Sequence, residues 1–122
     1  MNLVSLRPIL LMLSGFLGAS GVALAAAASH GGDTRLLGNA STMCLAHAPV
    51  ILALCLGHRM LRTALPAGAV LALGTLVFVG DLVWRHLEQA SLFPMAAPLG
   101  GLLMIAGWLL VAAGAFFRHG ND

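Results

Sequence analysis

Charged side chains are scarce in this sequence: only 8% of its 122 residues are charged, and all six basic residues are arginines. A soluble domain with 60% hydrophobic residues and a mean hydropathy of +0.98 would expose more apolar surface than water tolerates. The arginines are scattered singly along the chain, which is not the pattern of a nucleic-acid-binding surface. The composition therefore excludes a soluble module and a nucleic-acid partner, and it predicts an integral membrane protein.

Cysteines and catalytic motifs are also few. Cys44 and Cys55 are the two cysteines, and they lie about 16 Å apart on one predicted helix, too far for a disulfide. Cys44 and His47 are close enough to share an ion, but a tetrahedral metal site needs more ligands. The chain has no nucleophile elbow, phosphate loop or dinucleotide fingerprint. We expect no catalytic residues, no cofactor and no metal site.

Four long apolar stretches remain, at residues 8–29, 36–57, 66–87 and 94–117. Each supplies the roughly 20 apolar residues that a helix needs to cross about 30 Å of hydrocarbon. Pro8 suits a first helical turn, and Gly31 with Gly32 suits the end of the first helix. The sequence predicts an all-α fold: one integral membrane domain over residues 1–122, built as a four-transmembrane-helix bundle that runs up-down-up-down.

The arginines also predict an orientation. Four of them fall on one side of the predicted membrane and two on the other: Arg7, Arg59, Arg62 and Arg118 against Arg35 and Arg85. Because cytoplasmic loops carry the excess of basic residues, we expect both termini in the cytoplasm. An alternative is that residues 1–28 form a cleaved signal peptide. Their apolar run is long for such a peptide, and cleavage would leave only three spans.

Small residues recur at helical spacing in the first and fourth spans. Such residues let neighbouring backbones approach closely in a membrane. The candidate packing glycines are Gly18, Gly21, Gly100, Gly101 and Gly107. They predict packing within the bundle, with a dimer interface as the alternative.

Asp81 is the acidic residue that falls at membrane depth, and Arg85 follows it one helical turn later on the same face. A carboxylate in lipid normally finds a partner inside the bundle. Three interpretations stay open: a structural ion pair that fixes the depth of the third span, a carboxylate in a proton or substrate path, and simple exposure to water at the outer end.

Two histidines complete the candidate polar cluster of His30, His47, Asp81 and Arg85. His47 lies in the second span within a turn or two of the depth of Asp81. It is expected either as a buried neutral imidazole or, with Asp81, as a couple that exchanges a proton near neutral pH. His30 follows the first span, where a cationic side chain complements the helix dipole.

Several segments resemble one bacterial family, the YgdD-like inner-membrane proteins of domain of unknown function 423. They are "GASGVALAAAASH", "LAHAPVILAL", "GDLVWR" and "FPMAAPLGGLLMIAGWLLVAAGA", which occur in that order. The resemblance covers nearly the whole chain and implies a small multi-pass protein of the bacterial inner membrane whose molecular role is unassigned. It also implies that the first span is retained, and it carries over no functional residues.

Two functions follow as hypotheses. The first is a non-enzymatic interaction or accessory component of the membrane, whose partners are the lipid bilayer and either a second copy or another membrane protein met through helix faces. The alternative is a small proton-coupled carrier, as a monomer or a dimer, that uses Asp81. Small multidrug transporters have a similar length, but their essential carboxylate is in the first span, and this first span has no acid.

Overall fold

The computed structural model describes residues 2–30 and 33–117, and within them four long helices form the fold. These are α1 (Leu6–Ala28), α2 (Arg35–Leu56), α3 (Ala64–Glu88) and α4 (Ala96–Ala113). Short 3-10 turns, Leu3–Ser5 and Gly114–Phe116, precede α1 and follow α4. All four helices are long and apolar enough to cross a membrane, so the predicted fold class is confirmed. Gly31, Gly32 and Arg118 lie outside the described residues.

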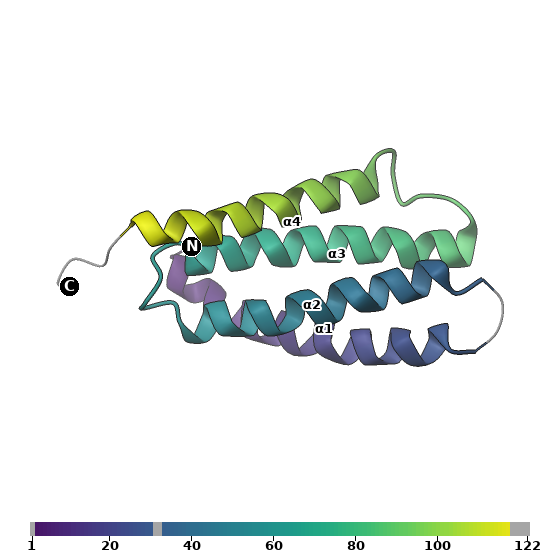
Figure 1. Ribbon diagram of the computed structural model, residues 1–122, viewed down its shortest axis with the longest axis horizontal. Coiled ribbons are helices and arrows are strands. Elements are labelled where there is room, and N and C mark those ends of the chain that lie inside the picture. The colour runs from purple at the N-terminus through teal and green to yellow at the C-terminus, as the bar shows by residue number, and fades with distance from the viewer. Residues whose placement is uncertain (1, 31–32, 118–122) are drawn as a thin grey trace.

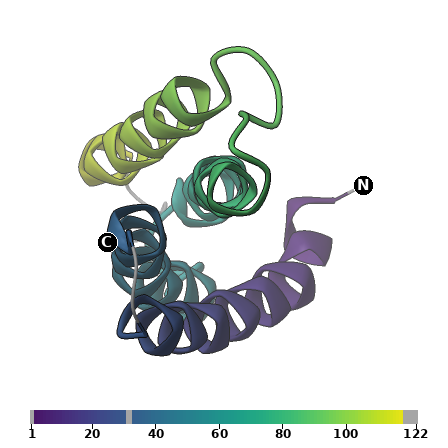
Figure 2. The ribbon, with the colours of Figure 1, turned by 90° about the vertical axis from the view of Figure 1, so that its right-hand side faces the viewer.

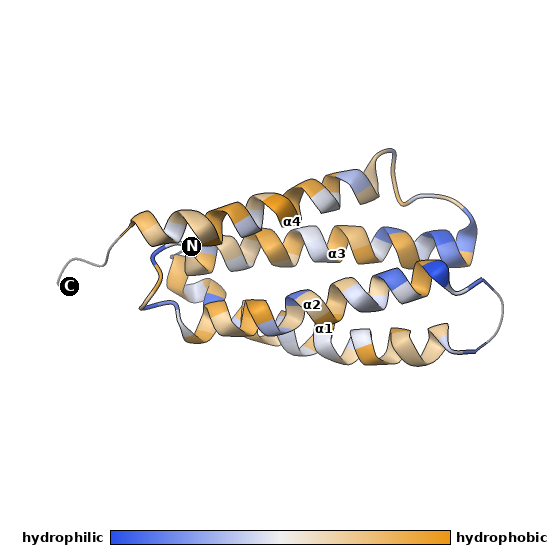
Figure 3. Cartoon of the chain, in the orientation of Figure 1, coloured by the Kyte–Doolittle hydropathy of each residue, from blue (hydrophilic) through white to orange (hydrophobic). Residues whose placement is uncertain are grey.

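The helices run antiparallel to their neighbours and lie side by side in chain order, as Figures 1 and 2 show. α2 and α3 are the inner helices: 44% of the residues in their most apolar stretches are buried, against 22% for α1 and α4. Hydrophilic residues gather at the two ends of the bundle, and hydrophobic ones cover the spans (Figure 3). This distribution is what a protein surrounded by lipid requires.

α3 and α4 approach each other closely because glycines face one another at their contact. A Cβ built on Gly100 would lie 2.6 Å from the backbone nitrogen of Phe78 and 2.9 Å from the carbonyl oxygen of Gly74. A Cβ built on Gly107 would lie 2.6 Å from the side chain of Leu71. The predicted use of Gly100 and Gly107 in packing corresponds to this α3–α4 contact.

α1 and α2 form a second close pair. A Cβ on Gly21 would lie 2.7 Å from the side chain of Leu45, and the Ser41 hydroxyl donates a 2.7 Å hydrogen bond to the Gly21 carbonyl. Gly18 is in ordinary contact with Ala48, at 3.8 Å. Gly101 differs from these glycines, because a Cβ there would meet nothing within 4 Å. The contacts of the described residues thus give Gly101 no packing role inside the chain.

Polar side chains tie the helices together at the end of the bundle where α1 begins. The Arg7 Nε atom donates a 3.1 Å hydrogen bond to the carbonyl oxygen of Cys55 and so joins α1 to the end of α2. The Thr63 hydroxyl donates a 2.7 Å bond to the carbonyl oxygen of Leu110 and so joins the start of α3 to α4. Both bonds use carbonyls that lie on the neighbouring helix, so they fix the position of each helix along the bundle axis relative to its neighbour.

Candidate functional site

Asp81 is fully buried, and both of its carboxylate oxygens accept hydrogen bonds. The Nε atom of Arg85, one turn later on α3, lies 2.7 Å from Oδ2. The backbone amide of Leu92, in the connection to α4, lies 2.9 Å from Oδ1. Asp81 therefore joins two parts of the chain: the last turns of α3, through Arg85, and the connection that follows, through Leu92.

The connection between α3 and α4 explains why a carboxylate is useful at this position. It begins at Gln89 and ends at Met95, and both adopt left-handed backbone conformations, with φ of 58° and 69°. For a residue with a side chain this conformation costs roughly 1–2 kcal/mol. A hydrogen bond from Leu92 to a charged acceptor offsets part of that cost and holds the connection against the end of α3.

His47 is buried on α2 and bonded through both ring nitrogens. Its Nδ1 lies 2.9 Å from the carbonyl oxygen of Met43, and its Nε2 lies 3.2 Å from the indole Nε1 of Trp108 on α4. An indole nitrogen can only donate, so Nε2 must be the acceptor and Nδ1 must carry the proton that goes to Met43. The two contacts together require a neutral imidazole in a single tautomer.

The Trp108 ring stands edge-on to His47, with ring centroids 6.0 Å apart. Trp108 is 44% exposed, so it lies at the margin of α4 rather than filling the interior of the bundle. This bond connects α2 with α4, two helices that are not neighbours in chain order. It is a polar contact across the inner part of the bundle, where lipid offers no competing partner.

The four predicted site residues divide between separate sets of hydrogen bonds. Asp81 and Arg85 come together as their spacing predicted. Among the residues that the structure describes, no hydrogen bond joins His47 to Asp81, and His47 bonds Met43 and Trp108 instead. His30 lies just past α1, exposed, with its backbone amide bonded to Ala27. The functional roles of all four residues stay predictions.

Three residues that take part in these contacts were not predicted from the sequence. Leu92 acts through its backbone amide, which leaves no trace in the residue type. The donor nitrogen of Trp108 was the one available signal in the sequence for a polar partner. Gly74, which meets Gly100 across the α3–α4 contact, lies in the third span and was not among the candidate packing glycines.

The chemistry available to these groups is limited. Over residues 2–30 and 33–117, no group of three or more His, Cys, Asp or Glu side chains could hold a metal ion. Cys44 and Cys55 are buried free thiols, as their spacing predicted. Asp81 is bonded to Arg85 and Leu92, and His47 to Met43 and Trp108.

Comparison with known proteins agrees with the resemblance seen in the sequence. A family model described as "Protein of unknown function (DUF423)" matches residues 10–101. The UPF0382 membrane protein SH2409 of Staphylococcus haemolyticus is 42% identical over 50 residues, which are 41% of this chain and 41% of that protein. The UPF0382 inner membrane protein YgdD of Escherichia coli K12 is 42% identical over 45 residues, 37% of this chain and 34% of that protein.

The matched segments therefore span less than half of either relative. No solved structure matches this chain. The relatives are bacterial membrane proteins, and this chain has four helices able to cross a membrane, so the predicted multi-pass location in the inner membrane is confirmed.

Proposed function

We propose that this chain, which belongs to the DUF423 family, is a non-enzymatic interaction component of the bacterial inner membrane that acts through the outer surfaces of its helices. One observation carries the proposal: Asp81 and His47, which are buried in the spans, have hydrogen-bond partners within the chain for both carboxylate oxygens and both ring nitrogens. What such a bundle can offer a partner is then its lipid-facing surface.

α4 provides the surface that we assign to the partner. Gly100 and Gly107 are used against α3, whereas Gly101 faces open space. Ile105 lies one turn beyond Gly101 on the same face and is 58% exposed. In lipid, helix association depends on close packing of this kind, since there is no hydrophobic driving force between apolar surfaces. A second copy or another membrane protein would pack here.

Photocrosslinking in native membranes tests this proposal. A photoreactive amino acid at Ile105 of α4 should give a protein adduct of one defined mass. The same residue at Val22, 64% exposed on α1, is the matched control and should give lipid adducts. An adduct of twice the chain mass would identify a second copy as the partner. Lipid adducts alone at Ile105 would overturn the proposal.

The alternative carrier function requires Asp81 to release its partners during each transport cycle. The bonds to Arg85 and Leu92 favour a structural role, because both oxygens are occupied and the side chain is 0% exposed. A transport phenotype that Asp81→Asn abolishes, in a variant that folds normally, would favour the carrier instead.

The proposed orientation places both termini in the cytoplasm. Arg7, Arg59 and Arg62 lie at the end of the bundle where α1 begins, which supports this assignment. Met60 is 88% exposed at that end, and Ser91 lies in the connection at the opposite end. A membrane-impermeant maleimide should label Ser91→Cys in cells with a permeable outer membrane, and Met60→Cys only after the inner membrane is opened. The reverse pattern would contradict the orientation.

A further inference from the structure

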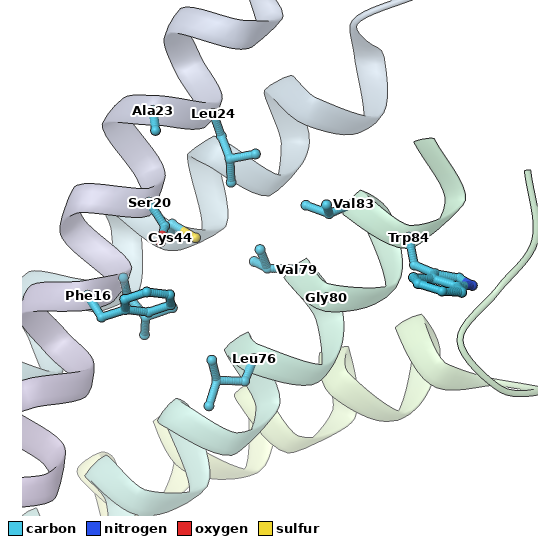
Figure 4. A pocket seen from close by; sticks show the side chains of 11 residues that line it. Phe16, Ser20, Ala23, Leu24, Cys44, Leu76, Val79, Gly80, Val83 and Trp84 are labelled. Carbon is cyan, nitrogen blue, oxygen red and sulfur yellow. The ribbon is translucent and has the colours of Figure 1, made fainter. Parts of the chain in front are cut away.

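A groove of about 420 Å³ separates α1 from α3 in one half of the bundle. Figure 4 shows side chains of the two helices facing each other across it, with Cys44 of α2 at its floor. The walls include Phe16, Ser20 and Leu24 from α1 and Leu76, Val79 and Val83 from α3. Trp84, at the end of the α3 wall, is also part of the lining.

The groove exists because α1 and α3 are in contact in one half of the bundle and apart in the other. Nearer the start of α1, a Cβ built on Gly68 of α3 would lie 3.3 Å from the side chain of Leu10. Further along, no side chain of α2 or α4 fills the space between residues 16–24 of α1 and residues 76–84 of α3. Within the described residues the gap therefore opens directly to the surrounding lipid.

The extent of the groove along the bundle matches one leaflet of a bilayer. Its lining covers eight residue steps on each wall, or about 12 Å at helical rise. Each wall begins near the middle of its helix and runs toward the end that carries the α1–α2 and α3–α4 connections. One leaflet contributes about half of the roughly 30 Å hydrocarbon thickness. The groove thus runs from the midplane of the membrane toward one surface.

The volume of the groove is smaller than that of a helix of the same length. A helix with its side chains is about 10–12 Å across, so a 12 Å length of helix would fill roughly 900 Å³ or more. The groove holds 420 Å³, less than half of that volume. A helix of a second copy or of another protein would therefore lie mostly outside the groove, whereas an extended hydrocarbon chain is much thinner than a helix and fits within it.

The absence of charged side chains from the lining also restricts which molecule can bind in the groove. The lining carries no acidic or basic side chain, and its polar side-chain groups are the Ser20 hydroxyl, the Cys44 thiol and the Trp84 indole N–H. Whatever lies in the groove must therefore be uncharged along its length. At the end of the bundle that carries the α1–α2 and α3–α4 connections, Arg35 and Arg85 stand against Asp33, Asp81 and Glu88, with Arg85 paired to Asp81, so the headgroup end has no strong preference for one charge.

From these observations we infer that the α1–α3 groove is a binding site for one acyl chain of a glycerophospholipid from a single leaflet. The chain lies between Phe16 and Trp84 and packs against both walls. It fills space that the protein leaves open and thereby contributes to the association of α1 with α3. This site is separate from the α4 surface assigned to a partner, so either assignment can fail without the other.

Lipid photolabelling of the full chain tests the site. The chain is reconstituted in vesicles of phosphatidylethanolamine and phosphatidylglycerol that contain a small fraction of phosphatidylcholine with a diazirine in the middle of one acyl chain. After illumination, peptide mapping compares labelling of the groove with labelling of Met12 and Val22, which are 69% and 64% exposed on α1 and lie outside the groove lining. We expect preferential labelling at the groove residues.

Two alanines on α1 give a matched pair of variants. Ala23 lines the groove, whereas Ala26 is exposed on the same helix and is not part of the lining. Ala23→Phe should fill the groove and remove the preferential labelling, while Ala26→Phe should leave it unchanged. If circular dichroism shows that Ala23→Phe does not fold, Val83→Phe fills the groove from the α3 wall and takes its place.

Three results would overturn the inference. Equal labelling of the groove and of Met12 and Val22 would mean that only loosely associated lipid surrounds the protein. Labelling that persists in the filled variants would place the bound chain elsewhere. An unlabelled groove, with dimers captured by cysteine crosslinking from Phe16→Cys, would mean that a second copy covers it.

Discussion

Gly100 and Gly101 are adjacent glycines on α4 whose substitution by alanine should have opposite effects. In Gly100→Ala the new methyl group would lie 2.6 Å from the backbone nitrogen of Phe78 and 2.9 Å from the carbonyl oxygen of Gly74. Both contacts are with backbone, which cannot move aside as a flexible side chain can. α3 and α4 would have to separate, and overpacking of this kind costs about 1–3 kcal/mol.

Gly101→Ala is the internal control, because its methyl group would meet nothing within 4 Å. Both variants share the helix-propensity gain of alanine over glycine, up to about 1 kcal/mol. The difference between their unfolding free energies therefore isolates the clash, and we expect Gly100→Ala to be less stable than Gly101→Ala by about 1–3 kcal/mol.

Unfolding in mixed micelles with rising dodecyl sulfate fraction, followed by the fluorescence of Trp84 and Trp108, provides the measurement. Gly101→Ala should unfold at or above the midpoint of the unsubstituted chain, and Gly100→Ala below it. Equal midpoints for the two variants would refute the close backbone contact between α3 and α4. A lower midpoint for Gly101→Ala would show that its face of α4 is packed in the folded state.

The same assay tests three further contacts. Asp81→Leu leaves the Leu92 amide without its acceptor and should lower the unfolding free energy by about 1–3 kcal/mol. Asp81→Asn keeps an acceptor and should lower it less. Equal losses of stability in the two variants would contradict the hydrogen bond between Asp81 and Leu92. His47→Phe and Trp108→Phe should show a coupling of about 1 kcal/mol in a double-mutant cycle, and independent effects would mean that the two rings do not bond. Ser41→Ala breaks a bond to α1 and should cost about 0.5–1.5 kcal/mol. Thr42→Ala, which loses a bond within α2 only, should cost less, and the opposite order would exclude the Ser41 bond.

The extent of the helices could be predicted from the sequence because the membrane sets it. The observed helices begin and end within two residues of the predicted spans, when the 3-10 turn Gly114–Phe116 is counted with α4. A span must cover a fixed thickness of hydrocarbon, and polar residues or Gly and Pro mark its ends. This constraint acts on each helix separately, so it needs no knowledge of the neighbours.

The rotation of α4 could not be predicted, since its sequence is apolar on every side. Residues on opposite faces, such as the buried Met104 and the exposed Leu102, are both apolar. In a soluble helix a polar face would have shown which side meets solvent. In lipid no such signal exists, and Gly100 and Gly101, about 100° apart on the helix, were equally good candidates for the contact with α3.

The same argument explains why one polar contact was predictable and another was not. Asp81 and Arg85 are four residues apart on one helix, so helical geometry alone brings them together. His47 and Trp108 are sixty-one residues apart on α2 and α4, and their contact depends on the depth and rotation of both helices. His47 lies about 18 Å from the start of α2 and Asp81 about 10 Å from the end of α3 at the same side of the bundle. His47 is therefore deeper by more than one helical turn, and at its depth Trp108 is the donor that satisfies it.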